Sequence, residues 1–181
     1  MERGALRLRG QDEAGARADF DQATALAPND ATLSLRIAVT YVGTGHFDEA
    51  IERLDRWVRA NPRDDRVPAM LAARCRSRAF AGTGLDQALS DCNAALNRGH
   101  RTADVYDGRA LLWLRFGKFD KSIADYRESL GLQPKVAETL YGLGLAEHRK
   151  GLTAAGDADI AAATALQPQI VQDFNRAGLA P

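Results

Sequence analysis

Small and large apolar residues recur along the chain with the spacing of an α-helix. The stretch "GHFDEAIERLDRWVRANP" at 45–62 and the stretch "GKFDKSIADYRESLGLQP" at 117–134 share a Gly, a Phe-Asp pair, an Ile and a Pro at matching places. In each stretch a small residue is followed four residues later by a large apolar one, and a further residue of the stripe comes three later. That spacing puts all three on one helical face. The two stretches therefore predict two similar amphipathic helices.

The prolines show the length of the repeating unit. Pro28 and Pro62 lie 34 residues apart, as do Pro134 and Pro168, and the distance from Pro62 to Pro134 is two such periods plus four residues. Small residues recur on this period in an upstream helical segment of each unit, at Gly4, Ala38, Ala72, Ala110 and Gly144. Others recur in the downstream segment, at Ala16, Ala50, Ala88, Ser122 and Gly156. Small side chains at fixed places let two helices approach closely, so a helical repeat array is indicated.

Each unit reads as a helix, a turn and a second helix. Gly45 and Gly117 supply the flexible backbone that stops the first helix, and the prolines end the second one. The third unit contains "RAFAGTGLDQA", which is four residues longer than its counterparts, with the insertion near 79–84. This insertion is interpreted as a harmless loop extension or as a protruding contact element.

The repeating helix–turn–helix of 34 residues resembles the tetratricopeptide repeat (TPR) family. The resemblance implies an all-α fold, a right-handed superhelix of antiparallel helix pairs (an α-solenoid). The expected units are a partial first repeat at 1–30, repeats at 31–64, 65–102, 103–136 and 137–168, and a C-terminal capping helix at 169–178. The first helix is short, so the chain is interpreted as a fragment of a longer protein, or as one whose N-terminal edge another chain covers.

In the TPR family the first helix of every repeat lines the concave side. Carried over by position, the resemblance implies a partner-binding groove lined by Leu35, Val39, Val42, Ala69, Ala73, Arg76, Asp107, Leu111, Leu114, Arg115, Tyr141, Leu145, His148 and Arg149. This is an apolar floor with basic groups near the turns. It suits an extended peptide or a helix with apolar anchors and a few carboxylates. Alternatively, these residues pack against another part of the same protein.

Two cysteines lie at similar distances from one turn. Cys75 precedes the turn of the third unit by about five residues, and Cys92 follows it by about six, so the two face each other within one helical hairpin. They are expected either to form a disulfide or to remain two reduced thiols in a packed core. A disulfide would favour the periplasm over the cytoplasm of a bacterium. The chain has 20 Arg and only 4 Lys, a bias that suggests a bacterial source.

Arg109 replaces the apolar residue expected on the first helix of the fourth unit. A half-buried guanidinium needs an acceptor, so a structural ion pair with Asp91 or Asp125 is expected rather than an anionic ligand. The three histidines lie in different units, and no His/Cys cluster has the spacing of metal ligands. No catalytic residue, metal or cofactor is therefore predicted.

The charges add little to this picture. The 24 basic and 24 acidic side chains cancel, so no nucleic-acid partner is expected, and no apolar run is long enough for a membrane span.

The leading hypothesis is a non-catalytic scaffold that binds a peptide or protein segment in its concave groove. The alternatives are a regulatory or substrate-positioning tail of a larger enzyme with its catalytic domain upstream, and a homotypic assembly unit that joins through its N-terminal edge.

Overall fold

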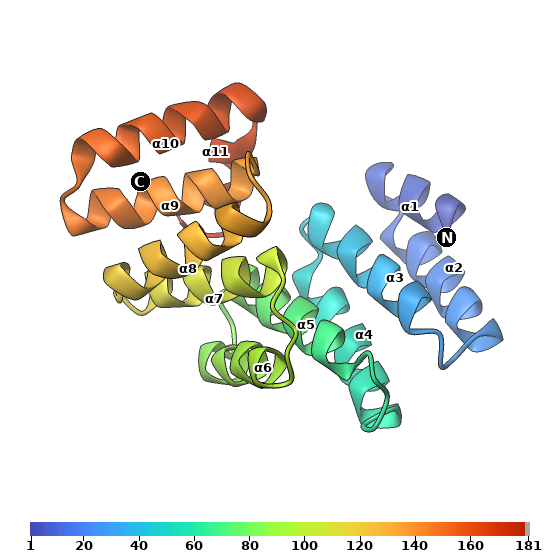
Figure 1. Ribbon diagram of the computed structural model, residues 1–181. Coiled ribbons are helices and arrows are strands. Elements are labelled where there is room, and N and C mark those ends of the chain that lie inside the picture. Colours follow the sequence, from blue (N-terminus) through green and yellow to red (C-terminus); the bar gives the residue numbers. More distant parts are fainter. Residues whose placement is uncertain (180–181) are drawn as a thin grey trace.

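The computed structural model describes residues 1–179 of the chain, and the regular elements within that range are all α-helices (Figure 1). Ten of them form five antiparallel pairs that stack along the chain, and an eleventh follows. The predicted all-α fold is confirmed. The helices are α1 (Glu2–Arg9), α2 (Glu13–Leu26), α3 (Ala31–Gly43), α4 (Phe47–Ala60), α5 (Val67–Ala81), α6 (Leu85–Asn97), α7 (Ala103–Arg115), α8 (Phe119–Leu132), α9 (Ala137–Lys150), α10 (Thr153–Leu166) and α11 (Ile170–Arg176).

Local sequence signals set many of the helix ends. The side chains of Asp12 and Asp30 cap α2 and α3, each accepting a hydrogen bond of 2.9 Å from a backbone N–H in the first turn. Gly45 and Gly117 have φ values of 82° and 69°, a left-handed conformation that glycine adopts without steric cost. These residues therefore turn the chain between the two helices of a pair.

The small residues of the repeat lie where paired helices touch. Ala16, Ala50, Ala88 and Ala110 have no exposed surface. In the last pair the backbones approach closely, because a Cβ added to Gly144 would lie 2.8 Å from the carbonyl oxygen of Gly156. Larger side chains at these positions would force the helices apart, so the core of the array depends on this pattern of small residues.

The four inserted residues lengthen a helix instead of a loop. The helix α3 ends at residue 43, so its counterpart 34 residues later would end at 77, whereas α5 ends at Ala81. Four residues are close to one helical turn of 3.6, so the faces of α5 keep their directions. The turn that follows occupies only 82–84. The insertion thus adds one turn to the end of α5.

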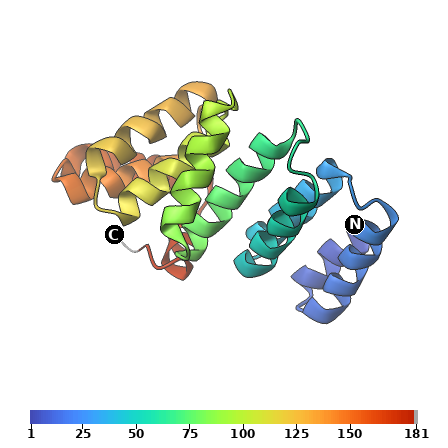
Figure 2. The ribbon, with the colours of Figure 1, turned by 90° about the horizontal axis from the view of Figure 1, so that it is seen from below.

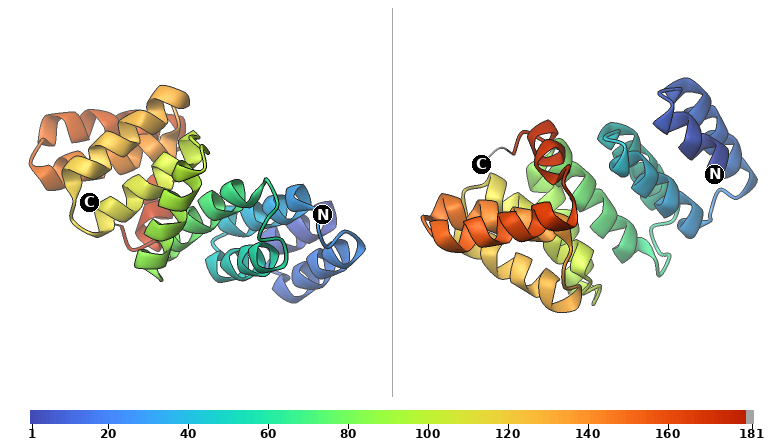
Figure 3. Two further views of the ribbon diagram at one scale, coloured as in Figure 1. Left: turned by 60° about the horizontal axis from the view of Figure 1, so that its bottom comes forward. Right: turned by 90° about the horizontal axis from the view of Figure 1, so that it is seen from above.

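The position of α11 differs from that expected of a capping helix. A cap would cover the outer face of α10, but Ala154, Ala158 and Ala161 on that helix remain exposed. Instead α11 returns to the side of the array formed by the first helices of the pairs. Figures 2 and 3 show it beside α5, although the two are far apart in the sequence. Phe174 of α11 contacts Phe80 at the end of α5.

The first pair contacts the second through an aromatic contact and a buried cation. The rings of Phe20 and Tyr41 meet edge to face with their centroids 5.2 Å apart. The side chain of Arg53 is only 5% exposed, and its guanidinium donates to Asp21 at 2.7 Å and to the hydroxyl of Thr24 at 2.5 Å. Because a buried guanidinium needs acceptors, these contacts couple α4 to α2.

Candidate binding groove

An open groove of about 820 Å³ lies between α3, α5 and α11. We call it the open groove. Its apolar residues come mainly from the first helices of the second and third pairs. Its polar residues come from α5, where Arg76 and Ser77 lie, from 100–104, from Glu138 and from the C-terminal segment. The lining residues that the argument below uses are Leu35, Val39, Val42, Ala69, Ala73, Arg76, Phe80, Thr102, Asp104, Glu138, Asp173 and Arg176.

The floor of the open groove follows from the helical spacing of α3 and α5. Leu35, Val39 and Val42 lie at intervals of four and three, so they share one face of α3. The side of α5 that faces them carries Ala69 and Ala73, whose small side chains leave room. Val39 is 59% exposed, an unusual degree for a valine on a helix of the array core. An apolar surface is thus available to a ligand here.

The structure divides the groove expected from the sequence into two halves. Six of the fourteen expected residues, those of α3 and α5, line the open groove. The eight from α7 and α9 do not. Of these, Leu111, Leu114, Tyr141 and Leu145 are at most 1% exposed. The ring of Phe174 packs against that of Tyr141 with a centroid distance of 4.7 Å. The C-terminal helix therefore occupies this part of the concave side, as one of the two interpretations of the sequence allowed.

Arg115, the predicted groove residue at the end of α7, forms its hydrogen bonds within the chain. Arg115 donates hydrogen bonds to the carbonyl oxygens of Ala79 and Phe80 at 2.6 and 3.0 Å. It also donates to the carbonyl of Ala177, directly after α11, at 2.7 Å. This guanidinium joins the added turn of α5 to the end of α11. The expectation that Arg115 offers its charge to a ligand is therefore wrong.

The remaining residues of the predicted set lie outside the open groove. His148 contacts Asp157 of α10 at 2.9 Å, which links the two helices of the last pair. Arg149 lies in the last turn of α9. Asp107 is 6% exposed and sits behind Arg76 of the groove wall. None of these three belongs to the surface that a groove ligand would touch.

The wall of the open groove beside α7 and α9 is acidic. Arg76 forms ion pairs with Asp107, at 3.5 Å from Nε to Oδ2, and with Glu138. Asp104 lines the groove next to them. Burial raises the pKa of the Asp107 carboxyl to about 6. The nearby Arg76 lowers that pKa, and the negative charges of Glu138 and Asp104 raise it. One guanidinium thus faces three carboxylates.

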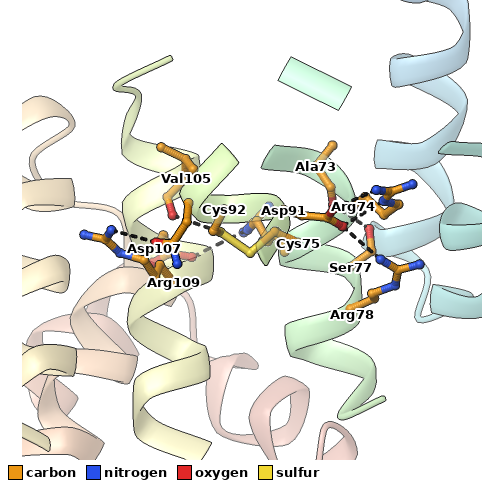
Figure 4. Close-up of a disulfide and its surroundings, with 12 residues drawn as sticks. Ala73, Arg74, Cys75, Ser77, Arg78, Asp91, Cys92, Val105, Asp107 and Arg109 are labelled. Atoms are coloured by element: carbon orange, nitrogen blue, oxygen red, sulfur yellow. Dashed lines mark hydrogen bonds and ion pairs between the residues drawn. A yellow bond between two sulfur atoms is a disulfide. The ribbon is translucent and has the colours of Figure 1, made fainter. Parts of the chain in front are cut away.

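A disulfide joins Cys75 of α5 to Cys92 of α6, with Cα atoms 5.5 Å apart (Figure 4). Both cysteines have no exposed surface, so the bond lies inside the third pair of helices. Of the two interpretations of these cysteines, the structure contains the disulfide. It closes a loop in the repeat that carries the inserted turn.

Beside the disulfide, the aspartates of the second helices pair with arginines (Figure 4). Arg74 and Arg78 both donate to Asp91, at 2.6–2.8 Å, and both also contact Asp55 of α4. These contacts join the second and third pairs. Asp91 is therefore not the partner of Arg109.

The acceptor of Arg109 is Asp125. Its guanidinium makes two hydrogen bonds to this carboxylate, at 2.7 and 2.8 Å, and the indole N–H of Trp113 donates to the same group at 3.1 Å. In the first pair, Arg3 binds Asp19 at the corresponding repeat positions. The Arg3–Asp19 and Arg109–Asp125 pairs each connect the two helices of one repeat, so these aspartates have partners within the chain without a ligand.

Among residues 1–179, no group of three or more His, Cys, Asp or Glu side chains is placed to hold a metal ion. Over the same residues, none of the helices combines the length and the apolar character needed to cross a bilayer.

Comparison with sequence families gives two matches, both described as tetratricopeptide repeat. One covers residues 8–75 and the other covers residues 108–169. Among curated proteins, the human PEX5-related protein is 22% identical over 140 residues, which are 73% of this chain and 22% of that protein. The chain therefore spans about a fifth of the length of this relative.

Several solved structures share the fold. A thermophilic TPR protein of Thermus thermophilus, TTC0263, is 23% identical with a TM-score of 0.67, over 98% of this chain and 97% of that one. The protein MamA is 22% identical with a TM-score of 0.62, over 95% and 92%. YrrB, described as a TPR protein with an unusual peptide-binding site, is 15% identical with a TM-score of 0.56, over 88% and 80%. At these identities the likeness shows the fold.

Proposed function

Because the chain belongs to the tetratricopeptide repeat family, and is on that ground a protein-interaction scaffold, we propose that it binds a peptide or helical segment of another protein in the open groove. The proposal specifies the site: the partner lies on α3 and α5, between these helices and α11. Catalysis has no part in it.

One observation carries the proposal: the concave side already holds an amphipathic helix of the same chain. The helix α11 is bound through Ile170 and Phe174, four residues apart, which are 0% and 1% exposed. Gln172, Asn175 and Arg176 of the same helix are exposed. This is the helix-in-groove mode of recognition, with apolar anchors at helical spacing. The open groove continues the same surface and has an apolar floor of its own, so it supports binding of a second segment.

Selection from a random peptide library tests this function. The purified chain would be used to select displayed 12-residue peptides, and the affinity of the enriched peptides would be measured by fluorescence anisotropy. Val39→Asp places a charge on the groove floor, so we expect it to abolish binding. Leu132→Asp is the matched control, because Leu132 is 52% exposed on α8, and no residue of that helix lines the groove. Peptides that bind both variants equally, or no enrichment at all, would contradict the proposal.

A second proposal concerns the compartment. A buried disulfide forms and persists in oxidising surroundings, so its presence in a packed repeat supports folding in the periplasm or outside the cell. A thiol count on the denatured, unreduced protein from its native compartment tests this. Two free thiols would place the folded chain in a reducing compartment.

Self-association through the N-terminal edge is a further proposal with one supporting observation. Leu6 of α1 is 65% exposed at the open end of the array. Sedimentation equilibrium over a range of concentrations tests it, with Leu6→Glu as the variant. A monomer at every concentration would exclude this role.

A further inference from the structure

We infer that the segment bound in the open groove carries a lysine or arginine close to its apolar anchors. This inference rests on the proposed function and names the partner's charge. The sequence suggested the opposite: a ligand with carboxylates, held by the arginines at the ends of the first helices. The structure removes the basis for that expectation at two of these arginines, because Arg76 is ion-paired within the chain and Arg115 donates its hydrogen bonds to backbone carbonyls.

The charges around the groove wall do not balance. Asp104, Asp107 and Glu138 surround the guanidinium of Arg76, which contacts two of them. These four groups carry three negative charges and one positive charge when ionised. Asp173 and Arg176 also line the groove, but they pair with each other and add no net charge. The cluster therefore carries an excess of two negative charges, and its groove-lining carboxylates, those of Asp104 and Glu138, are the ones that a bound segment can meet.

Buried polar atoms in the same wall lack hydrogen-bond partners among the described residues. They are the Oδ1 atom of Asp107, the hydroxyl oxygen of Thr102 and the Nε atom of Arg76, so two of the three can accept a hydrogen bond from a ligand. Burial raises the pKa of Asp107, and so do the neighbouring carboxylates, because both disfavour its charge. A cation placed at the wall would lower the electrostatic cost of this cluster. An incoming carboxylate would increase it.

The geometry places apolar and acidic surfaces within one groove. Val39 and Val42 form its floor on α3, whereas Asp104 and Glu138 stand on α7 and α9 at its opposite side. A single short segment can therefore place an apolar side chain on the floor and a cationic one at the wall. Lysine and arginine suit this arrangement, because their long apolar stems cross the floor while the charged group reaches the carboxylates. Charge complementarity of this kind contributes mainly to specificity and to the association rate.

The test uses the peptides selected on the wild-type chain. We expect the enriched sequences to carry Lys or Arg near an aliphatic or aromatic residue. In anisotropy measurements, Asp104→Lys should weaken binding of the best of these peptides about twofold to fivefold, the range of an exposed ion pair. Glu128→Lys is the control, because Glu128 is exposed on α8 outside the groove and the change in net charge is the same. A peptide with its basic residue changed to Glu should recover affinity on the Asp104→Lys variant.

The outcomes separate the two proposals. The inference would be overturned, and groove binding left intact, by either of two results. In the first, peptides whose binding Val39→Asp abolishes lack basic residues. In the second, such peptides bind the Asp104→Lys variant as tightly as they bind the wild type. If no peptides are enriched, or if those enriched bind regardless of Val39→Asp, both proposals fall. The melting temperature of each variant, measured beside its affinity, separates loss of binding from loss of fold.

Discussion

The ring of Phe80 on α5 lies against the ring of Phe174 on α11, edge to face, with centroids 5.9 Å apart. Phe80 belongs to the turn that the four-residue insertion adds to α5. Arg115 reinforces this contact by binding carbonyl groups of both elements. Ring packing and hydrogen bonds therefore hold the added turn of α5 against the C-terminal helix. Together they decide how much of the concave side stays open.

Removal of the Phe174 ring should release α11. For a fully buried ring, Phe174→Ala costs about 3–5 kcal/mol, and this is an upper limit here because α11 can detach while the repeats stay folded. We expect faster amide hydrogen exchange in 170–179 and only a modest fall in melting temperature. Asn175→Ala, at an exposed position of the same helix, should change neither. Unchanged exchange in the Phe174 variant would mean that α11 is held by other contacts.

The disulfide should stabilise the array measurably. It joins residues 17 apart, and closing a loop of that size is worth about 3 kcal/mol in the chain-entropy treatment. Urea denaturation with and without dithiothreitol measures this difference. The double variant Cys75→Ala/Cys92→Ala serves as control, since its stability should not respond to the reductant. Equal stability of the wild type under both conditions would show that the bond contributes nothing.

Asp107 should make the stability depend on pH in an unusual direction. Its pKa is about 6 in the folded chain, above the value of 3.8 for an unperturbed aspartate. The folded state thus binds the proton more tightly than the unfolded state does. The resulting stabilisation is complete below pH 3.8 and is lost as the pH rises through 6.

The variant Asp107→Asn isolates this contribution, because an amide does not titrate. Relative to wild type, we expect it to be more stable by about 1–3 kcal/mol at pH 7.5, with the difference vanishing near pH 4. Urea denaturation at several pH values provides the measurement. A variant less stable than wild type at pH 7.5 would show that the charged pair with Arg76 outweighs the cost of burial.

The small residues of the repeat give a test of the register. Ala110 on α7 has no exposed surface, and the hydroxyl of Ser122 on α8 donates to its carbonyl oxygen at 2.8 Å. Ala110→Leu should overpack this contact and cost about 1–3 kcal/mol. Ala161→Leu makes the same change at an exposed position of α10, so its melting temperature should stay close to that of wild type. Equal stability of both variants would contradict the assigned packing.

The sequence by itself determined the repeating helix pairs. Helices, turns and the contacts between paired helices depend on residues close together in the chain, and the spacing of Ala38, Ala50 and Gly45 is visible without a structure. The half of the groove formed by α3 and α5 could be named for the same reason. Groove residues can be assigned from their position in the repeat wherever a repeat contacts only the neighbouring repeats.

Only the tertiary structure decided which part of the concave side stays open and what charge it shows. The contact of Phe174 with Tyr141 joins residues that the repeat period does not relate, because α11 is not a member of the repeat. The charge at the groove wall depends on ion pairs between helices, such as that of Arg76 with Glu138 on α9. Periodicity reports which face of a helix a residue occupies. It carries no information about which distant segment covers that face, or which distant carboxylate neutralises a charge on it.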